Sequence, residues 1–114
     1  NYAMPSSVIA RESKNKNCFI AEGCEIYGTI THSIISTGCT VAPGAIVEDS
    51  VIMPNVHIES GAIIRHAIIG EDCRICRGAV IGGSFARGEE KKISVVGKAK
   101  TIAENTAIKP GDIY

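Results

Sequence analysis

The sequence matches itself when it is shifted by 17 residues. From position 35 to position 83 this shift places large aliphatic residues in three columns: Ile35/Ile52/Ile69, Val41/Ile58/Ile75 and Val47/Ile64/Ile81. A second set of columns, four positions later, holds smaller residues: Cys39/Val56/Cys73 and Ala45/Ala62/Ala79. Within each repeat the anchors lie six residues apart, except that the third interval is five. Neither the 3.6-residue period of a helix nor the alternation of an amphipathic strand produces this spacing, which is typical of hexapeptide β-helix repeats.

The six-residue period predicts an all-β chain in which each hexad forms one short strand and a turn. Three hexads make one triangular coil, and successive coils stack at ~4.8 Å, the distance between paired strands. The 19 Ile and 8 Val, with no Leu and no Trp, favour this pleated structure over a helix bundle. The turns are expected to need positive φ angles, which Gly and Asn adopt at low cost. The candidates for these turns are Gly38, Gly44, Asn55, Gly61 and Gly78.

The repeat also predicts the domain limits. Residues 1–17 do not fit it and are expected to be an irregular N-terminal segment, followed by one hexapeptide-repeat domain over 18–114. Shifting back once more places Cys18, Cys24 and Ile30 in the three columns, although Ile20 and Ile26 then sit two positions off. After Gly83 the period stops for a polar loop, 84–92, and it resumes at Val96, Ile102 and Ile108. We therefore expect about five coils, with one protruding loop before the last.

Charge, hydrophobicity and cysteine content argue against several functions, among them nucleic-acid binding and membrane association. Twelve basic and twelve acidic residues balance, so no nucleic-acid partner is expected. No run of 18 apolar residues and no signal-peptide pattern at the start is present, which predicts no membrane partner and a cytoplasmic protein. Five cysteines in such a protein are expected to be reduced. Cys73 and Cys76 have CxxC spacing without a second ligand pair, so buried thiols are favoured over a metal or redox site.

Two groups of polar residues are weighed as candidate sites. His32, Asp49 and His66 recur at one corner and favour an exposed polar corner over a carbonic-anhydrase-like metal site. A hexapeptide acyltransferase needs a base histidine near a protruding loop, but loop 84–92 contains none. Basic residues gather late in the chain and could hold a sugar phosphate, although an ordinary solvated surface is an alternative. The candidate phosphate-binding residues are Arg74, Arg77, Arg87, Lys91, Lys92 and Lys98.

Several stretches resemble one enzyme family. The run from Ile20 to Ile35, with its Gly-Cys-Glu-Ile-Tyr-Gly segment and Ser33-Ile-Ile corner, is similar to the first coil of the C-terminal domain of bacterial glucose-1-phosphate adenylyltransferases. The stretch from Glu48 to Pro54 resembles that family's Asp-Ser-Val-Ile-Met-Pro segment, and Ile93 to Lys98 resembles its strand into the last coil. The resemblance covers nearly the whole chain from Cys18 onward. It implies a left-handed parallel β-helix.

The resemblance implies a function beyond the residues present. The family joins ATP and glucose 1-phosphate to give ADP-glucose and pyrophosphate, for glycogen synthesis, in an N-terminal catalytic domain that this chain lacks. Mg and ATP are therefore implied for a full-length protein, whereas no catalytic, cofactor or metal residue is expected in this chain. The implied partners are that catalytic domain, a homo- or hetero-oligomer (a tetramer in the family) and a sugar-phosphate activator. The alternative is a freestanding hexapeptide acyltransferase or carbonic-anhydrase-like trimer.

Overall fold

The computed structural model describes residues 7–10 and 14–114. All regular elements in this part of the chain are short strands, because each side of a coil is only two or three residues long before the chain turns. The strands are β1 (Val8–Ile9), β2 (Lys14–Lys16), β3 (Phe19–Ile20), β4 (Glu25–Ile26), β5 (Thr29–Thr31), β6 (Ile34–Ile35), β7 (Thr40–Val41), β8 (Ile46–Glu48), β9 (Val51–Ile52), β10 (His57–Ile58), β11 (Ile63–Arg65), β12 (Ala67–Ile69), β13 (Arg74–Ile75), β14 (Val80–Gly82), β15 (Ser94–Val96), β16 (Thr101–Ile102) and β17 (Ala107–Ile108).

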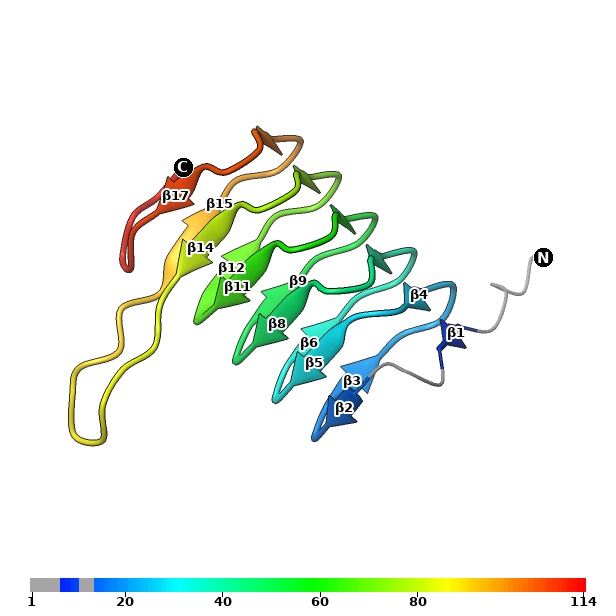
Figure 1. Cartoon of the computed structure of the whole chain (residues 1–114), viewed down its shortest axis with the longest axis horizontal. Helices are drawn as coiled ribbons and strands as arrows, with labels where there is room; N and C mark the ends of the chain where they lie inside the picture. The colour runs from blue at the N-terminus through cyan, green and yellow to red at the C-terminus, as the bar shows by residue number, and fades with distance from the viewer. Residues whose placement is uncertain (1–6, 11–13) are drawn as a thin grey trace.

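Every third strand pairs in parallel, which gives three sheets around one axis (Figure 1). Sheet A has the order β1-β4-β7-β10-β13-β16, sheet B the order β2-β5-β8-β11-β14-β17, and sheet C the order β3-β6-β9-β12-β15. The chain is thus a left-handed parallel β-helix of hexapeptide type. Five complete coils begin at β3, β6, β9, β12 and β15, which we number 1 to 5, and the predicted coil number is confirmed.

The interior is filled by the columns that the 17-residue shift predicts. All nine positions of the three large aliphatic columns are buried, and the smaller row Cys39, Val56 and Cys73 is buried with them. Ile69 pairs with Val96, which continues the first column into coil 5 as expected. The five predicted turn residues have φ between 60° and 82°, in the left-handed region. All five cysteines are free thiols.

The predicted register of coil 1 is wrong in two of its three columns. The structure pairs Ile20 with Ile35 and Ile26 with Val41, a shift of 15, so these isoleucines occupy the columns instead of Cys18 and Cys24. Only Ile30, which pairs with Val47, lies where the shift of 17 puts it. The cause is a corner between β4 and β5 that is two residues shorter than the corners beneath it.

Gly28 makes the short corner sterically feasible. A Cβ atom at this position would lie 2.6 Å from the carbonyl oxygen of Ala45 and 2.8 Å from that of Ala42, both on the neighbouring coil. The shortened corner therefore runs directly against the coil beneath it. Only a residue without a side chain fits there.

The N-terminal segment also differs from the expectation of an irregular structure over 1–17. β1 pairs with β4 and β2 pairs with β5, so the described part of this segment extends sheets A and B by one strand each. Val8 and Ile9 are about half exposed, which explains why no buried aliphatic column marked them. Residues 1–6 and 11–13 of the predicted segment lie outside the described residues.

The predicted loop 84–92 follows β14 and precedes β15, and it projects from the side of the β-helix (Figure 1). At the far end the chain returns to sheet C. The N–H of Val95 donates to the carbonyl of Asp112 (2.9 Å), and the N–H of Tyr114 donates to the carbonyl of Val95 (2.8 Å). These bonds satisfy part of the open edge that the last coil would otherwise present. No helix in the described part of the chain is long and apolar enough to span a membrane.

Candidate functional site

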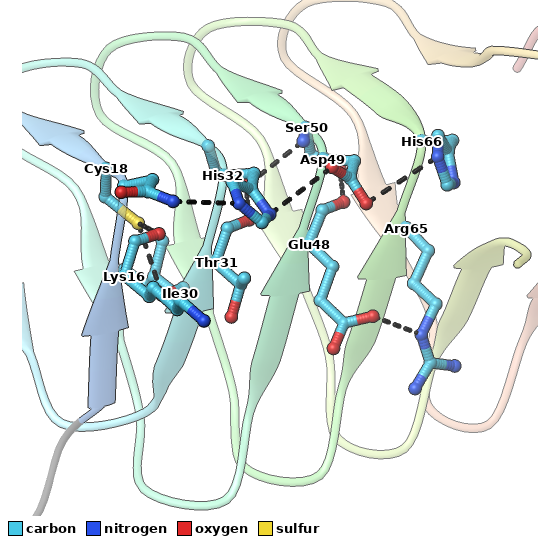
Figure 2. Close-up of polar contacts among 12 residues, drawn as sticks. Lys16, Cys18, Ile30, Thr31, His32, Glu48, Asp49, Ser50, Arg65 and His66 are labelled. Carbon is cyan, nitrogen blue, oxygen red and sulfur yellow. Dashed lines mark hydrogen bonds and ion pairs between the residues drawn. The ribbon is translucent and has the colours of Figure 1, made fainter.

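A ladder of polar side chains follows the corner between sheets B and C, which we call the B–C corner (Figure 2). Asn17, His32, Asp49 and His66 occupy it in successive coils, each with φ between 47° and 53°. Asn, Asp and His tolerate this left-handed conformation better than most side chains, which accounts for the residue types. Asn17 Nδ2 lies 3.0 Å from His32 Nε2, and His32 Nδ1 lies 3.9 Å from Asp49 Oδ1. Asp49 Oδ2 lies 3.6 Å from His66 Nε2.

His66 connects the ladder to the protruding loop. Its Nδ1 lies 2.9 Å from the carbonyl oxygen of Gly83, and its ring meets Phe85 edge-on at 5.0 Å between centroids. The sequence therefore does place a histidine beside loop 84–92, although from the preceding coil. Nδ1 thus faces a carbonyl acceptor, whereas Nε2 lies beyond hydrogen-bond distance of Asp49. A general base must reach the proton it removes, and the His66 side chain, only 14% exposed, offers a substrate little access.

Two buried serines fix the backbone beneath the ladder. Ser33 Oγ donates to the carbonyl of Thr31 (2.8 Å) and accepts from the N–H of Ser50 (3.1 Å). Ser50 Oγ repeats the pattern, donating to the carbonyl of Glu48 (2.7 Å) and accepting from the N–H of Ala67 (3.2 Å). A hydroxyl suits this place because it both donates and accepts, so these two buried backbone N–H groups have partners. The Ser-Ile and Ser-Val corners thus have a structural role.

The ladder is not arranged as a metal centre. Among the described residues no three His, Cys, Asp or Glu side chains converge in a way that could hold a metal ion. Cys73 is buried and donates to the carbonyl of Gly97 (3.0 Å), whereas Cys76 is half-buried. Burial raises the pKa of the Cys39 thiol to about 11, so this interior thiol stays protonated at neutral pH.

A second polar feature is an open groove of about 510 Å³ on sheet A, near its corner with sheet B. Glu59 lines it and accepts from Arg74 Nε (2.9 Å) and from the N–H of Arg77 (3.1 Å). These two donors hold the pKa of the Glu59 carboxyl below its usual value. His57 Nδ1 lies 3.1 Å from Thr40 Oγ1 at the groove wall. The groove was not anticipated from sequence, although the 17-residue spacing of Thr40, His57 and Arg74 aligns them on one outer face.

The structure divides the six predicted phosphate-binding residues among three corners of the prism. Arg74 and Arg77 line the sheet A groove, and Arg74 is already paired with Glu59. Arg87, Lys91 and Lys92 lie exposed on the loop at the B–C corner, and Lys98 lies exposed at the turn between sheets C and A. Arg74 and Arg77 thus form one local group and the three loop residues another, while Lys98 lies apart. Phosphate binding by any of these residues stays a prediction.

Comparison with known proteins identifies a family model and several curated relatives that match this chain. The family model described as "GlmU-like, C-terminal hexapeptide" matches residues 5–103. Glucose-1-phosphate adenylyltransferase of Clostridium perfringens is 39% identical over 59 residues, which cover 52% of this chain and 15% of the relative. The enzyme of that name from Clostridioides difficile is 44% identical over 54 residues, 47% of this chain and 14% of the relative. These relatives are thus much longer than the stretch they share with the chain.

Solved structures with the same fold include acetyltransferases. The acetyltransferase domain of PglB from Neisseria gonorrhoeae, in complex with acetyl coenzyme A, has a TM-score of 0.73 and 21% identity, covering 96% of this chain and 54% of that one. A putative acetyltransferase of Bacillus cereus has a TM-score of 0.61 and 16% identity, covering 98% and 74%. At these identities the likeness concerns the fold alone. The match over residues 5–103, together with the three parallel sheets around one axis, shows that the chain belongs to the GlmU-like C-terminal hexapeptide family.

Proposed function

We propose that this chain is the C-terminal assembly and regulatory domain of a cytoplasmic nucleotidyltransferase that makes ADP-glucose and pyrophosphate from ATP and glucose 1-phosphate. The observation that carries the proposal is the 39% identity to a glucose-1-phosphate adenylyltransferase over 59 residues. The solved acetyltransferases have only 21% or lower identity, although they share the fold over most of the chain. Sequence identity therefore favours the nucleotidyltransferase over the acyltransferase.

The chain's own residues fit a supporting role. Mg and ATP, which the proposed reaction needs, find no fitting site here: the described residues contain no metal-binding group, and Gly82-Gly83 is followed by an exposed loop instead of a phosphate-cradling turn. The rigid element is the stack of coils, and the projecting element is loop 84–92. We assign ATP, Mg and glucose 1-phosphate to a catalytic domain outside this chain.

Loop 84–92 is the segment that we propose binds a regulatory sugar phosphate. Arg87, Lys91 and Lys92 are exposed, and none of them is paired with an acidic side chain within the described residues. A sugar-phosphate activator offers oxygens that accept charge-assisted hydrogen bonds from such groups, each worth ~1.5–3 kcal/mol. Two such bonds would suffice for the roughly 1–3 kcal/mol of a typical allosteric coupling.

The acyltransferase alternative has weaker geometric support. His66 is only 14% exposed, whereas exposed His57 is positioned by the Thr40 hydroxyl and has no carboxylate partner among the described residues. Acyl transfer by a histidine base needs an oriented ring with one open nitrogen. His57→Ala is therefore the variant to use if acyl transfer is observed.

The test compares two reactions in two proteins. A full-length protein that carries this chain should form ADP-glucose from ATP and glucose 1-phosphate, whereas the 114-residue chain alone should form none. Both should be incubated in parallel with acetyl coenzyme A and amino-sugar acceptors. Acetyl transfer by the isolated chain, abolished by His57→Ala, would overturn the proposal. ADP-glucose formation by the chain alone would overturn the assignment of catalysis to another domain.

A further inference from the structure

The sheet A groove gathers hydrogen-bond donors that the fold itself does not use. Arg74 donates from Nε to Glu59, but its two Nη nitrogens make no hydrogen bond among the described residues. Arg77 bonds Glu59 only through its backbone N–H, so its guanidinium is also without a hydrogen-bond partner in the described part of the chain. His57 contacts Thr40 through Nδ1 (3.1 Å), which leaves Nε2 open. All five residues line the same groove of about 510 Å³.

Glu59 fixes the position of these donors before any ligand arrives. Its Oε2 accepts from Arg74 in the next coil, and its Oε1 accepts from the N–H of Arg77 at the turn that follows. A guanidinium carries five N–H donors, so four remain on Arg74. A side chain that is already held loses less conformational freedom on binding. His57 pairs in register with Arg74, so its ring lies on the adjacent strand of the same face.

A second ion pair of the molecule provides a comparison. Arg65 Nε donates to Glu48 Oε1 (2.8 Å), and this pair does not line the groove. Its arginine side chain is 30% exposed, whereas that of Arg74 is 64% exposed. Exposed ion pairs contribute little to stability. Stability of the fold therefore does not explain why two arginines and a histidine surround one carboxylate.

The groove combines a small positive charge with free acceptors. The two arginines and Glu59 sum to a net charge of +1 when His57 is neutral. A carboxylate has about four acceptor positions, and two of those on Glu59 are used. Ser60 Oγ donates to the carbonyl of Pro43 (2.6 Å), which leaves its own lone pairs available. The groove thus matches a ligand with one negative charge and adjacent hydroxyl groups, whereas a dianion is repelled by the Glu59 carboxylate.

We propose that the sheet A groove binds a small hydroxylated carboxylate, of the sugar-acid or hydroxy-acid class. The ligand carboxylate accepts hydrogen bonds from the outer nitrogens of Arg74 and Arg77. When the Thr40 hydroxyl donates to Nδ1 of His57, Nε2 carries the ring proton and donates as well. A hydroxyl group of the ligand donates to Glu59. The groove volume lies in the range of small-molecule sites.

The experiment titrates the 114-residue chain, labelled with ¹⁵N, with gluconate at pH 7.5 and constant ionic strength. Amide chemical shifts should change saturably at residues 57–60 and 74–77. The expected dissociation constant is about 1 mM, which two or three charge-assisted hydrogen bonds support. Acetate, which has no hydroxyl group, should bind at least about five-fold more weakly. Sulfate, a dianion, should also bind more weakly than gluconate.

Four variants test the assigned residues. R74A and R77A should each raise the dissociation constant for gluconate by at least about ten-fold. R65A is the matched control, because it removes the guanidinium of the other ion pair, and it should leave the constant unchanged. E59Q removes the charge that repels a dianion, so it should tighten sulfate binding by at least about three-fold. A residue that only stabilises the fold would not change the preference between two anions.

Binding is measured without any reaction, so the result is independent of the enzyme assignment. The dispersed amide spectrum of each variant establishes that it is folded. The absence of saturable shifts up to about 50 mM gluconate, or equal weakening by R65A and R74A, would overturn the site. Sulfate or acetate binding as tight as that of gluconate in the parent would overturn the ligand class. Unchanged sulfate binding in E59Q would show that Glu59 does not select the ligand charge and would refute its assigned role.

Discussion

Coils 2 to 4 and coil 1 are built from the same kind of strand, but their sequences specify the register differently. In coils 2 to 4 the spacing of the aliphatic columns equals the pairing shift of 17 residues on every face. In coil 1 the pairing shift is 15 on sheets A and C, and 17 on sheet B. The comparison shows that burial fixes which residues stack, whereas a corner can lose two residues without disturbing the columns when a glycine lets it run against the next coil.

The largest loss of stability is expected from truncating a buried side chain in a central aliphatic column. Ile58 is buried on every side between Val41 and Ile75, so Ile58→Ala should lower the free energy of unfolding by about 2–5 kcal/mol. Urea unfolding followed by circular dichroism measures it. Ile93→Ala, at an isoleucine 44% exposed beside the loop, is the control and should change little. A loss below ~1 kcal/mol for Ile58→Ala would mean that the column contributes far less than a core position should.

The next largest loss of stability is expected from a substitution in the short corner of coil 1. Gly28→Ala places a Cβ atom against two backbone carbonyls that cannot move independently of coil 2, so we expect a loss of about 1–3 kcal/mol. Gly97→Ala is the matched control, because its Cβ atom would make only ordinary contact, 3.5 Å from the nearest atom. If both variants unfold at the same urea concentration, the corner is looser than the structure shows.

Much of the fold was predictable because side-chain burial repeats along the chain. The interior positions, the turn residues and loop 84–92 all follow from spacing, since each coil imposes the same contacts on its own residues. The register of coil 1 was predicted wrongly, because the shift of 17 was extended across the short corner between β4 and β5. Ile20 and Ile26, two positions off the columns, were the sequence signal of that deletion. β1 was missed for a related reason: Val8 and Ile9 pair through backbone bonds but bury little side chain.

The candidate sites were less predictable than the fold. The 17-residue spacing correctly placed His32, Asp49 and His66 at one corner, but it could not show that His66 contacts Gly83 across the base of the loop. The basic residues lie close together in the sequence, but this could not show that the fold separates them in space. Positions a few residues apart in a β-helix fall on different faces, so Arg77 and Lys98 lie away from the loop residues they neighbour in the chain.

A smaller effect is expected at the sheet A groove, where a change of pH tests one exposed contact of the central coils. Arg74 and the N–H of Arg77 hold the pKa of Glu59 below its ordinary value of 4.5. A carboxyl with a lowered pKa stabilises the folded state above that ordinary value, and the stabilisation is lost as the pH falls below it. Glu59→Gln should therefore reduce the loss of stability between neutral pH and about pH 3.5. Glu71→Gln is the control; an equal acid loss in parent, Glu59→Gln and Glu71→Gln would contradict the coupling.

The smallest effect on stability, and the most specific one on function, is expected at the loop. Arg87, Lys91 and Lys92 are exposed, and the coils stack without their side chains, so changing all three to Ala should leave the free energy of unfolding within about 0.5 kcal/mol. In a full-length protein the same variant should raise the activator concentration needed for half-maximal ADP-glucose formation, while turnover without activator stays nearly unchanged. Arg74→Ala is the matched control, since it removes a cation from the sheet A groove and leaves the loop intact. An unchanged activator response in the triple variant would leave the loop as a solvated insertion, and a response lost in Arg74→Ala instead would move the anion site to sheet A.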